Sequence, residues 1–283
     1  MEKWKYLKYF RGLYWNFTFL RPLLAGIYDT IFPSAMKFSG LGLTTRHELP
    51  WNDDYDWGNF RKASVDIKKC FDFNDQDITM GIDLKNIDTC LYRHWIVSYA
   101  VRHAIEFAEN NDFNFVECGT AEGYTTFFAL REICEHKKTA NNFTMHLYDS
   151  WAALKKDGLT KSESIRVGYY KTLSIDRTKK NLAEFNDKVI YHQGYIPESF
   201  SASPEPPRSI IFLHIDLNAA KSTIDALNFF LPRLSKRGIV LFDDYGHLSF
   251  KDTKKAIDEF LLTNREFFRN FLLGKQFTIV DYF

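Results

Sequence analysis

An acidic residue and two glycines lie close together in residues 115–124, which read FVECGTAEGY. Glu117 ends an aromatic and β-branched run, and Gly119 and Gly123 follow it directly before an amphipathic stretch. Glycines in such a turn between a strand and a helix let a ligand approach the backbone closely. The spacing differs from the G-x-G-x-x-G of dinucleotide sites, and a carboxylate here would repel a pyrophosphate. The segment therefore favours a ligand that carries a positive charge or hydroxyl groups; the alternative is an ordinary glycine turn with a surface glutamate.

A second acid, Asp149, follows the apolar run of residues 143–148. In open α/β sheets an acid at the end of the second strand binds ribose hydroxyls, although a helix cap or a loop residue is an equal interpretation. S-adenosylmethionine has an amino group, a sulfonium and ribose hydroxyls but no phosphate, so we expect it to be the ligand. The third predicted strand ends with another glycine at the same edge. The candidate residues for binding S-adenosylmethionine are Glu117, Gly119, Thr120, Gly123, Tyr124, Asp149, Ser150, Gln193, Gly194 and Tyr195.

Three further acids follow the fourth and fifth predicted strands, namely Asp216, Asp243 and Asp244. Carboxylates brought together at one sheet edge repel one another unless a cation or protons offset the charge, which favours Mg²⁺ or Mn²⁺ with oxygen ligands. Consecutive strand residues point to opposite faces, so Asp243 and Asp244 share one ion only if the chain leaves strand geometry there. Gly246 favours such a turn. The alternative is that one aspartate binds the metal or the substrate while the other caps the following loop.

Two histidines, His214 and His247, lie near these acids in the sequence. Together with Asp216 they are the candidate catalytic residues, since histidine transfers protons near neutral pH. Each histidine of the chain is individually more often structural than catalytic. No zinc-binding spacing is formed by His94, His103, His192, His214 and His247.

From about residue 114 onward, short apolar runs alternate with longer amphipathic ones. This alternation predicts βαβ units and a parallel sheet that would position the candidate side chains. The expected strands are residues 113–117, 143–148, 189–192, 210–215, 239–242 and 277–282. The expected helices are residues 93–109, 124–135, 175–185, 222–234 and 252–262. We therefore predict a doubly wound, mostly parallel, seven-stranded-type Rossmann-like sheet over residues 90–283. Residues 1–89 would form a helical or irregular extension, either a lid or a flanking cap.

Composition limits the partners and the compartment. Lys and Arg number 37 against 36 Asp and Glu, a net charge of +1, which gives no reason to expect a nucleic acid. The four cysteines form no C-x-x-C pair, which favours a reduced, cytoplasmic compartment.

The first thirty or so residues are rich in aromatic and basic side chains. Arg21, Pro22 and Asp29 interrupt their apolar run, which excludes a membrane-spanning helix, and the pattern also fits a signal peptide poorly. Two interpretations stay open for residues 1–32. They form a helix that lies in a membrane interface, giving peripheral membrane contact, or a helix that docks on the domain or on a second subunit of a homo-oligomer.

The combined motifs resemble the macrocin O-methyltransferase family, metal-dependent enzymes of class I that methylate sugar hydroxyls. The resemblance covers residues 90–283 and rests on VECG (116–119), YDS (148–150), HIDLN (214–218), LPRL (231–234) and FDDYG (242–246), with ST (222–223) and AL (226–227). It implies that Glu117, Gly119 and Gly123 line the donor site, that Asp149 holds the ribose, and that Asp216, Asp243 and Asp244 bind Mg²⁺. The family reads Leu-Asp-Gly-Asp where this chain has Ile215-Asp216-Leu217-Asn218, so its candidate general base is an amide here.

We therefore expect an S-adenosylmethionine-dependent, Mg²⁺-assisted O-methyltransferase that acts on a sugar or glycan with vicinal hydroxyls. A catechol-like or other small acceptor is an alternative, because adjacent phenolic hydroxyls also chelate Mg²⁺. A further alternative, from a different class, is a glycan-binding or membrane-docking module that keeps the fold without turnover.

Overall fold

The computed structural model describes residues 36–38, 43–45, 49–52, 54–72, 87–109, 111–139, 142–202, 204–245, 248–264, 268–272 and 278–282. The chain forms two compact units, residues 1–58 with 73–92, and residues 59–72 with 93–283. In the first unit, β1 (Met36–Phe38) pairs antiparallel with β2 (Leu43–Thr45), and 3₁₀ turns span Pro50–Asn52 and Ile87–Cys90. None of the helices in these described ranges is long and apolar enough to cross a membrane.

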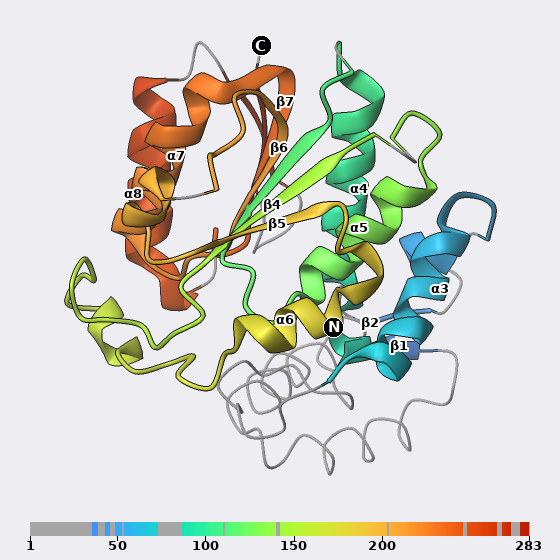
Figure 1. Ribbon diagram of the computed structural model, residues 1–283, viewed down its shortest axis with the longest axis horizontal. Coiled ribbons are helices and arrows are strands. Elements are labelled where there is room, and N and C mark those ends of the chain that lie inside the picture. Colours follow the sequence, from blue (N-terminus) through green and yellow to red (C-terminus); the bar gives the residue numbers. More distant parts are fainter. Residues whose placement is uncertain are drawn as a thin grey trace, which may run out of the picture. The chain divides into compact units, whose positions relative to one another are not determined.

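The second unit is built on a seven-stranded sheet with the order β5-β4-β3-β6-β7-β9-β8 (Figure 1). The parallel strands are β3 (Asn114–Cys118), β4 (Thr144–Asp149), β5 (Val189–Gln193), β6 (Ile210–Ile215) and β7 (Leu234–Phe242). β9 (Thr278–Tyr282) runs antiparallel to β7 and to β8 (Phe268–Leu272). This arrangement confirms the predicted doubly wound, mostly parallel fold.

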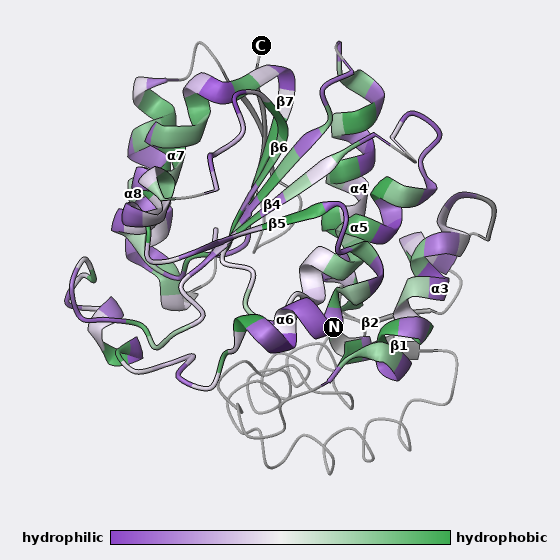
Figure 2. Ribbon diagram, viewed as in Figure 1, coloured by the Kyte–Doolittle hydropathy of each residue, from purple (hydrophilic) through white to green (hydrophobic). Residues whose placement is uncertain are grey.

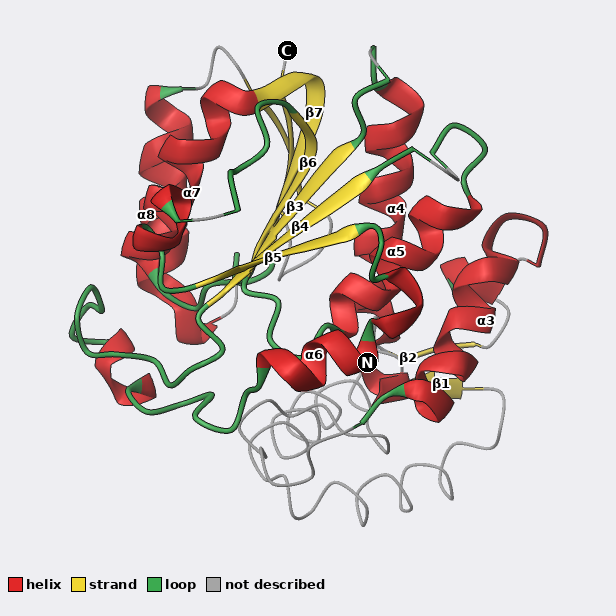
Figure 3. Ribbon diagram, viewed as in Figure 1, coloured by secondary structure: helices red, strands yellow, loops and turns green. Residues whose placement is uncertain are grey.

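Helices cover both faces of this sheet (Figure 3). α4 (Leu91–Phe107) and α5 (Tyr124–Glu135) lie on one face, and α7 (Ala220–Phe230) and α8 (Lys251–Thr263) lie on the other. α6 (Ile175–Asn181) precedes β5, and α3 (Asp54–Cys70) is kinked at Trp57, so that its later part belongs to the second unit.

Burial on both faces explains the apolar strands, which stand out in the middle of the molecule's second unit in Figure 2. Every residue of β6 is buried, as parallel strands between two helical layers require. On the α7 and α8 face the core contains Leu213, Leu227, Phe230 and Ile257. A core of this kind fixes the strands rigidly and leaves chemistry to the residues that follow them.

The strand register brings those following residues to one edge. Cys118 pairs with Tyr148 on one side and with Ile215 on the other, and Ile215 pairs with Phe242. The direction in which successive strands are added reverses between β3 and β6. Ligands of doubly wound sheets bind at the carboxyl ends of the strands beside such a reversal, so the fold itself selects this edge.

The strands and helices predicted over residues 90–283 agree with the structure to within a few residues, apart from the start of β7 and the absence of β8 from the prediction. In the extension, which was predicted to be helical or irregular, β1 and β2 form an antiparallel pair. β7 begins at Leu234 rather than at residue 239, and its pairing with β6 is irregular after Ile210. The polar residues 235–237 conceal this early part of the strand from a hydropathy pattern. α3 and β8 were not predicted as elements, and residues 1–32, Gly246 and His247 lie outside the described ranges.

Candidate active site

The loop between β3 and α5 has a backbone that only small residues allow. Gly119 and Gly123 have φ values of +92° and +88°, in the left-handed region that favours glycine. A Cβ atom on Gly119 would lie 1.8 Å from the carbonyl oxygen of Asp216. Gly119 is therefore required both by its conformation and by the close approach of Asp216, which directly follows β6. The glycine turn thus brings the segment predicted to bind the donor against the acid-bearing segment.

Asp149, at the end of β4, holds this loop through both of its carboxylate oxygens. Oδ2 accepts a hydrogen bond from the Ala121 N–H at 2.8 Å, and Oδ1 accepts one from the Trp151 N–H at 2.6 Å. Burial raises the pKa of Asp149, and these N–H groups partly offset the rise. Each oxygen keeps a further lone pair for hydroxyl donors. The ribose-binding role of Asp149 stays a prediction to which this geometry is suited.

Trp151 is a site residue for which the sequence suggested no role. Its indole Nε1 donates to the Ala121 carbonyl at 2.8 Å and lies 2.9 Å from the Thr178 hydroxyl oxygen. The Thr178 hydroxyl also donates to the Ala121 carbonyl, at 2.7 Å. Residues from the end of β4 and from α6 thus both hold the loop 119–123 in place. No local sequence motif predicts these contacts.

Glu117 points toward α5 on one face of the sheet rather than toward its carboxyl edge. The Thr126 hydroxyl donates to Glu117 Oε2, and the ring Nδ1 of His214 lies 2.8 Å from Oε1. Burial by itself lowers the pKa of His214, but the hydrogen bond and the charge of Glu117 outweigh it and the pKa is raised. Both side chains are at most 2% exposed. Donor binding by Glu117 and catalysis by His214 stay predictions; in the structure the pair ties β3 to β6 and to α5.

The end of β5 lies beside Asp149, as predicted. The Gly194 N–H donates to the Asp149 carbonyl at 2.9 Å, and the Tyr195 hydroxyl donates to the Ala153 carbonyl at 2.8 Å. Gln193 is exposed next to them.

The remaining predicted donor residues differ in their surroundings. The buried Thr120 Oγ1 has no hydrogen-bond partner among the described residues, and so is available to a ligand. Ser150 makes a local turn with Ala152. Tyr124 is buried and stacks on Phe71 with ring centroids 5.3 Å apart, which places it in the core below the loop.

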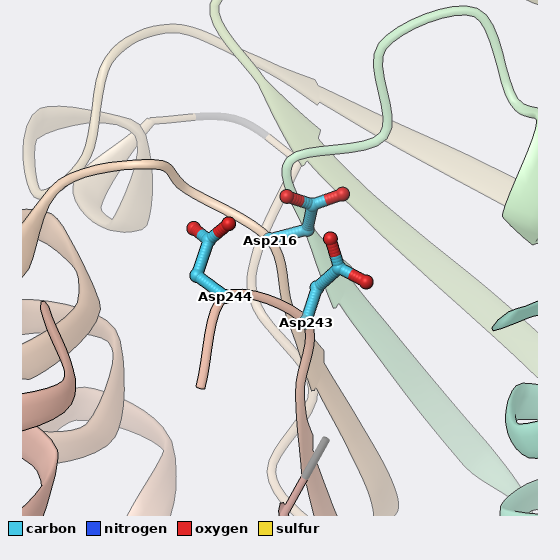
Figure 4. A group of neighbouring side chains, drawn as sticks. All are labelled: Asp216, Asp243 and Asp244. Atoms are coloured by element: carbon cyan, nitrogen blue, oxygen red, sulfur yellow. The ribbon is translucent and has the colours of Figure 1, made fainter. Parts of the chain in front are cut away.

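Asp216, Asp243 and Asp244 gather at the ends of β6 and β7 (Figure 4). One oxygen of each can be chosen so that all three lie within 4.8 Å of one another. β7 ends at Phe242, so Asp243 and Asp244 both follow the strand and can turn toward the same point. The condition for a shared ion is met, and the three predicted ligands are brought together.

Arg93, on the first turn of α4, is the side chain at this cluster that the sequence did not suggest. Its Nη2 lies 2.5 Å from Asp216 Oδ2 and 2.8 Å from Asp243 Oδ2. The one guanidinium therefore bridges two of the three carboxylates. The sequence placed Arg93 at the start of a helix, but nothing in its spacing from the acids could link it to them.

Asn218, the departure from the family pattern, connects the acids to their surroundings. Its N–H donates to Asp244 Oδ2 at 2.9 Å, and its side-chain Nδ2 donates to Asp216 Oδ1 at 3.1 Å. The Tyr170 hydroxyl donates to Asn218 Oδ1 at 3.3 Å. An amide can donate and accept at once, whereas a carboxylate would only add charge. Asn218 also has a φ of +56°, which asparagine tolerates better than most residues.

The donor set fits a hard divalent cation. Asp243 Oδ1 is buried and has no hydrogen-bond partner among the described residues. Burial raises the pKa of Asp243 to about 6 despite the nearby Arg93, and burial together with Asp216 and Asp243 raises that of Asp244 well above its usual range. Burial and the neighbouring carboxylates both disfavour the ionised aspartates, an effect that a bound cation would offset. Carboxylate oxygens are the ligands that Mg²⁺ and Mn²⁺ prefer.

Comparison with known proteins agrees with this geometry. Residues 116–245 match the family described as "Methyltransferase domain". The O-methyltransferase NovP superimposes with a TM-score of 0.56 at 17% identity, covering 68% of this chain and 80% of NovP. The calicheamicin methyltransferase CalS11 gives a TM-score of 0.54 at 13% identity, covering 82% of this chain and 94% of CalS11. The search of curated proteins gave no match.

The matched domain and the fold define the class of this chain. The chain contains a match to a methyltransferase domain at residues 116–245, and its second unit has the fold of O-methyltransferases. The prediction of a methyltransferase is confirmed, and the narrower assignment to the macrocin type stays a prediction.

Proposed function

We propose that this chain transfers the methyl group of S-adenosylmethionine to a hydroxyl of a sugar or glycan, with the help of Mg²⁺ or Mn²⁺. The observation that carries the proposal is the contact between the two halves of the site. The glycine loop expected to hold the donor touches the backbone of Asp216, which belongs to the carboxylate cluster expected to hold the cation. Donor and acceptor would therefore meet at one sheet edge.

Asp216, Asp243 and Asp244 would hold the cation. When bound, a cation of this kind orients two vicinal hydroxyls and makes one of them more acidic. The chain itself positions the donor through the loop 119–123 and Asp149, and such positioning supplies up to roughly 7–11 kcal/mol of the barrier reduction.

For the proton we assign Asp216 as the acceptor. The ring of His214 is buried and already bound to Glu117, whereas the Asp216 side chain is 16% exposed at the sheet edge. Asn218 holds one oxygen of Asp216 in place and cannot itself accept a proton. A role for His247 stays a prediction.

A sugar acceptor is favoured by two observations outside the chain's own geometry. CalS11 is described as a TDP-rhamnose 3'-O-methyltransferase, and the sequence motifs resemble those of macrocin-type enzymes. A catechol would present the same pair of adjacent oxygens, so the acceptor panel must contain both kinds of compound.

The test is a turnover assay of the purified chain with S-adenosylmethionine, Mg²⁺ and a panel of nucleotide sugars, glycosides and catechols. We expect S-adenosylhomocysteine and a product heavier by one methyl group with a sugar acceptor, and loss of both on chelation of the metal. A catechol product alone would replace the sugar proposal. A chain that forms no product with any acceptor would be the non-catalytic module instead.

Substitution of the carboxylates tests the site assignment. Asp243→Ala and Asp244→Ala should each lower turnover by about two to three orders of magnitude, the size typical for loss of one charged group in an active site. Asp225→Ala is the matched control, because Asp225 pairs with Lys221 on α7, outside the cluster. Full turnover in both cluster variants would show that the metal-assisted mechanism is wrong.

A further inference from the structure

Arg93 contacts two of the carboxylates that would bind a cation. The guanidinium contacts Asp216 Oδ2 and Asp243 Oδ2, at 2.5 and 2.8 Å, through a single nitrogen. Both contacts involve side chains that belong to the proposed metal cluster. Arg93 belongs to the second compact unit, residues 59–72 and 93–283, so its charge comes from the same unit as the carboxylates.

The charges explain why a basic residue is needed there in the absence of metal. Three aspartates within 4.8 Å of one another repel strongly when ionised. Arginine is always protonated, and its planar fork matches carboxylate oxygens. Arg93 therefore offsets part of the negative charge that would otherwise oppose folding at this edge.

The same position conflicts with a bound ion. Mg²⁺ lies about 2.0–2.1 Å from its oxygen ligands, whereas a guanidinium has only donors and cannot be a ligand. An ion that took the two Oδ2 atoms would therefore face a like charge at close range, with weak screening because the groups are partly buried.

We propose that Arg93 is a built-in competitor of the metal ion: it occupies the carboxylates in the metal-free protein and must release Asp216 and Asp243 before a divalent cation binds. This inference rests on the proposed function. It assigns Arg93 a positioning role, in which the residue keeps the empty cluster ordered and sets how much free cation is needed to fill it.

The experiment measures binding of Mn²⁺ alone to the full chain, by the electron paramagnetic resonance signal of the free ion. The wild type is compared with Arg93→Met, which keeps an unbranched apolar stem without the charge, and with Arg93→Lys, which keeps the charge without the guanidinium. We expect Arg93→Met to bind Mn²⁺ roughly tenfold more tightly than the wild type. Arg93→Lys should lie between the two.

A control variant separates the two proposals. Asp243→Asn removes a ligand and should weaken Mn²⁺ binding in the wild-type and in the Arg93→Met background. If Mn²⁺ binds the wild type in an Asp243-dependent way but Arg93→Met binds equally or more weakly, the competitor role is overturned while the metal site stands. If no variant binds Mn²⁺, the metal site and the competitor role are overturned together.

Thermal unfolding supplies a second readout that does not depend on turnover. Without metal, Arg93→Met should unfold at a lower temperature than the wild type, because three carboxylates lose their counter-charge. Mn²⁺ should then raise the unfolding temperature of Arg93→Met more than that of the wild type, since at equal Mn²⁺ concentration the tighter complex is stabilised more. An equal rise in both proteins would contradict the proposal.

Discussion

At the residue scale, the contact between Gly119 and Asp216 makes the most stringent demand on the sequence. A Cβ at residue 119 would lie 1.8 Å from a backbone carbonyl oxygen, which no rotamer change can relieve. The neighbouring Ala121 also has a positive φ, +50°, but its conformation is held by hydrogen bonds to Asp149, Trp151 and Thr178. The loop therefore tolerates backbone strain at one position and forbids a side chain at the other.

A Gly119→Ala variant should be destabilised by about 3 kcal/mol or more, because the clash adds to the cost of a left-handed conformation. Unfolding in urea measures the change. Gly168→Ala is the matched control, since Gly168 has a φ of +84° with open space around it. It should cost only about 1–2 kcal/mol. Equal losses in the two variants would mean that β6 yields at Asp216.

Some of the site residues could be predicted from the sequence alone, and others could not. The types and spacing of Asp216, Asp243 and Asp244 led to a shared cluster, and the structure brings them together. Arg93 could not be foreseen, because its contact with Asp216 spans 123 positions of sequence and arginine on a helix is most often solvated. The departure at Asn218 was visible, but its use as a connector depends on Tyr170, which only the fold brings close.

At the element scale, the long connection between β4 and α6 is fastened to the helices on one face of the sheet. The buried Glu163 accepts hydrogen bonds from the Ala220 N–H at 2.8 Å, on the first residue of α7, and from the Thr160 N–H at 2.9 Å. Arg166 donates to the carbonyls of Asn218 and Ser249. The segment therefore borders the carboxylate cluster in a fixed position.

Removal of Glu163 should loosen this segment. Glu163→Ala leaves the N–H groups of Ala220 and Thr160 without their acceptor, which should cost on the order of 2–3 kcal/mol. Hydrogen exchange should become faster in residues 154–173 and at the start of α7. Glu205→Ala, at an exposed loop residue, should change stability by no more than about 0.5 kcal/mol. Unchanged exchange in the segment would show that Arg166 and Tyr170 hold it without Glu163.

Helices and strands with a clear hydropathy pattern could be predicted from the sequence, and segments without one could not. α5 begins at Tyr124 and ends at Glu135 as expected, because a glycine turn precedes it and most of its residues are buried. The connection between β4 and α6 has no such period. Its order comes from contacts with Ala220, Asn218 and Ser249, residues far away in the sequence, so no local signal could reveal it.

At the scale of the whole molecule, two buried histidines make the stability of the fold depend on pH. His146 Nδ1 lies 2.9 Å from His192 Nε2, and the His192 ring stacks on Tyr148 with centroids 4.0 Å apart. Burial lowers the pKa of each histidine to about 4. The folded protein therefore favours the neutral rings, whereas the unfolded chain takes up protons near pH 6.5.

Stability should accordingly be fully present above about pH 6.5 and should fall as the pH is lowered toward 4, because the unfolded state then binds more protons. The loss should reach a few kcal/mol for the pair. A series of urea unfolding curves between pH 7 and pH 4 measures it. His192→Phe keeps a ring on Tyr148 and removes one titrating group, so its slope should be roughly half as steep. An identical slope would assign the pH dependence to another buried group, such as His94, whose pKa burial also lowers.

One feature of the sheet edge limits how this chain could change its acceptor. The backbone ladder continues past the strands: the Gly119 N–H donates to the Tyr148 carbonyl at 2.8 Å, the Asp216 N–H to Cys118 at 2.8 Å and the Asp243 N–H to Ile215 at 3.0 Å. Neighbouring strands are about 4.8 Å apart. The hydrogen bonds of the backbone therefore fix the distance between the loop 119–123 and the carboxylates. In the proposed reaction, larger or smaller acceptors would be accommodated by the loops, because these hydrogen bonds keep that spacing fixed.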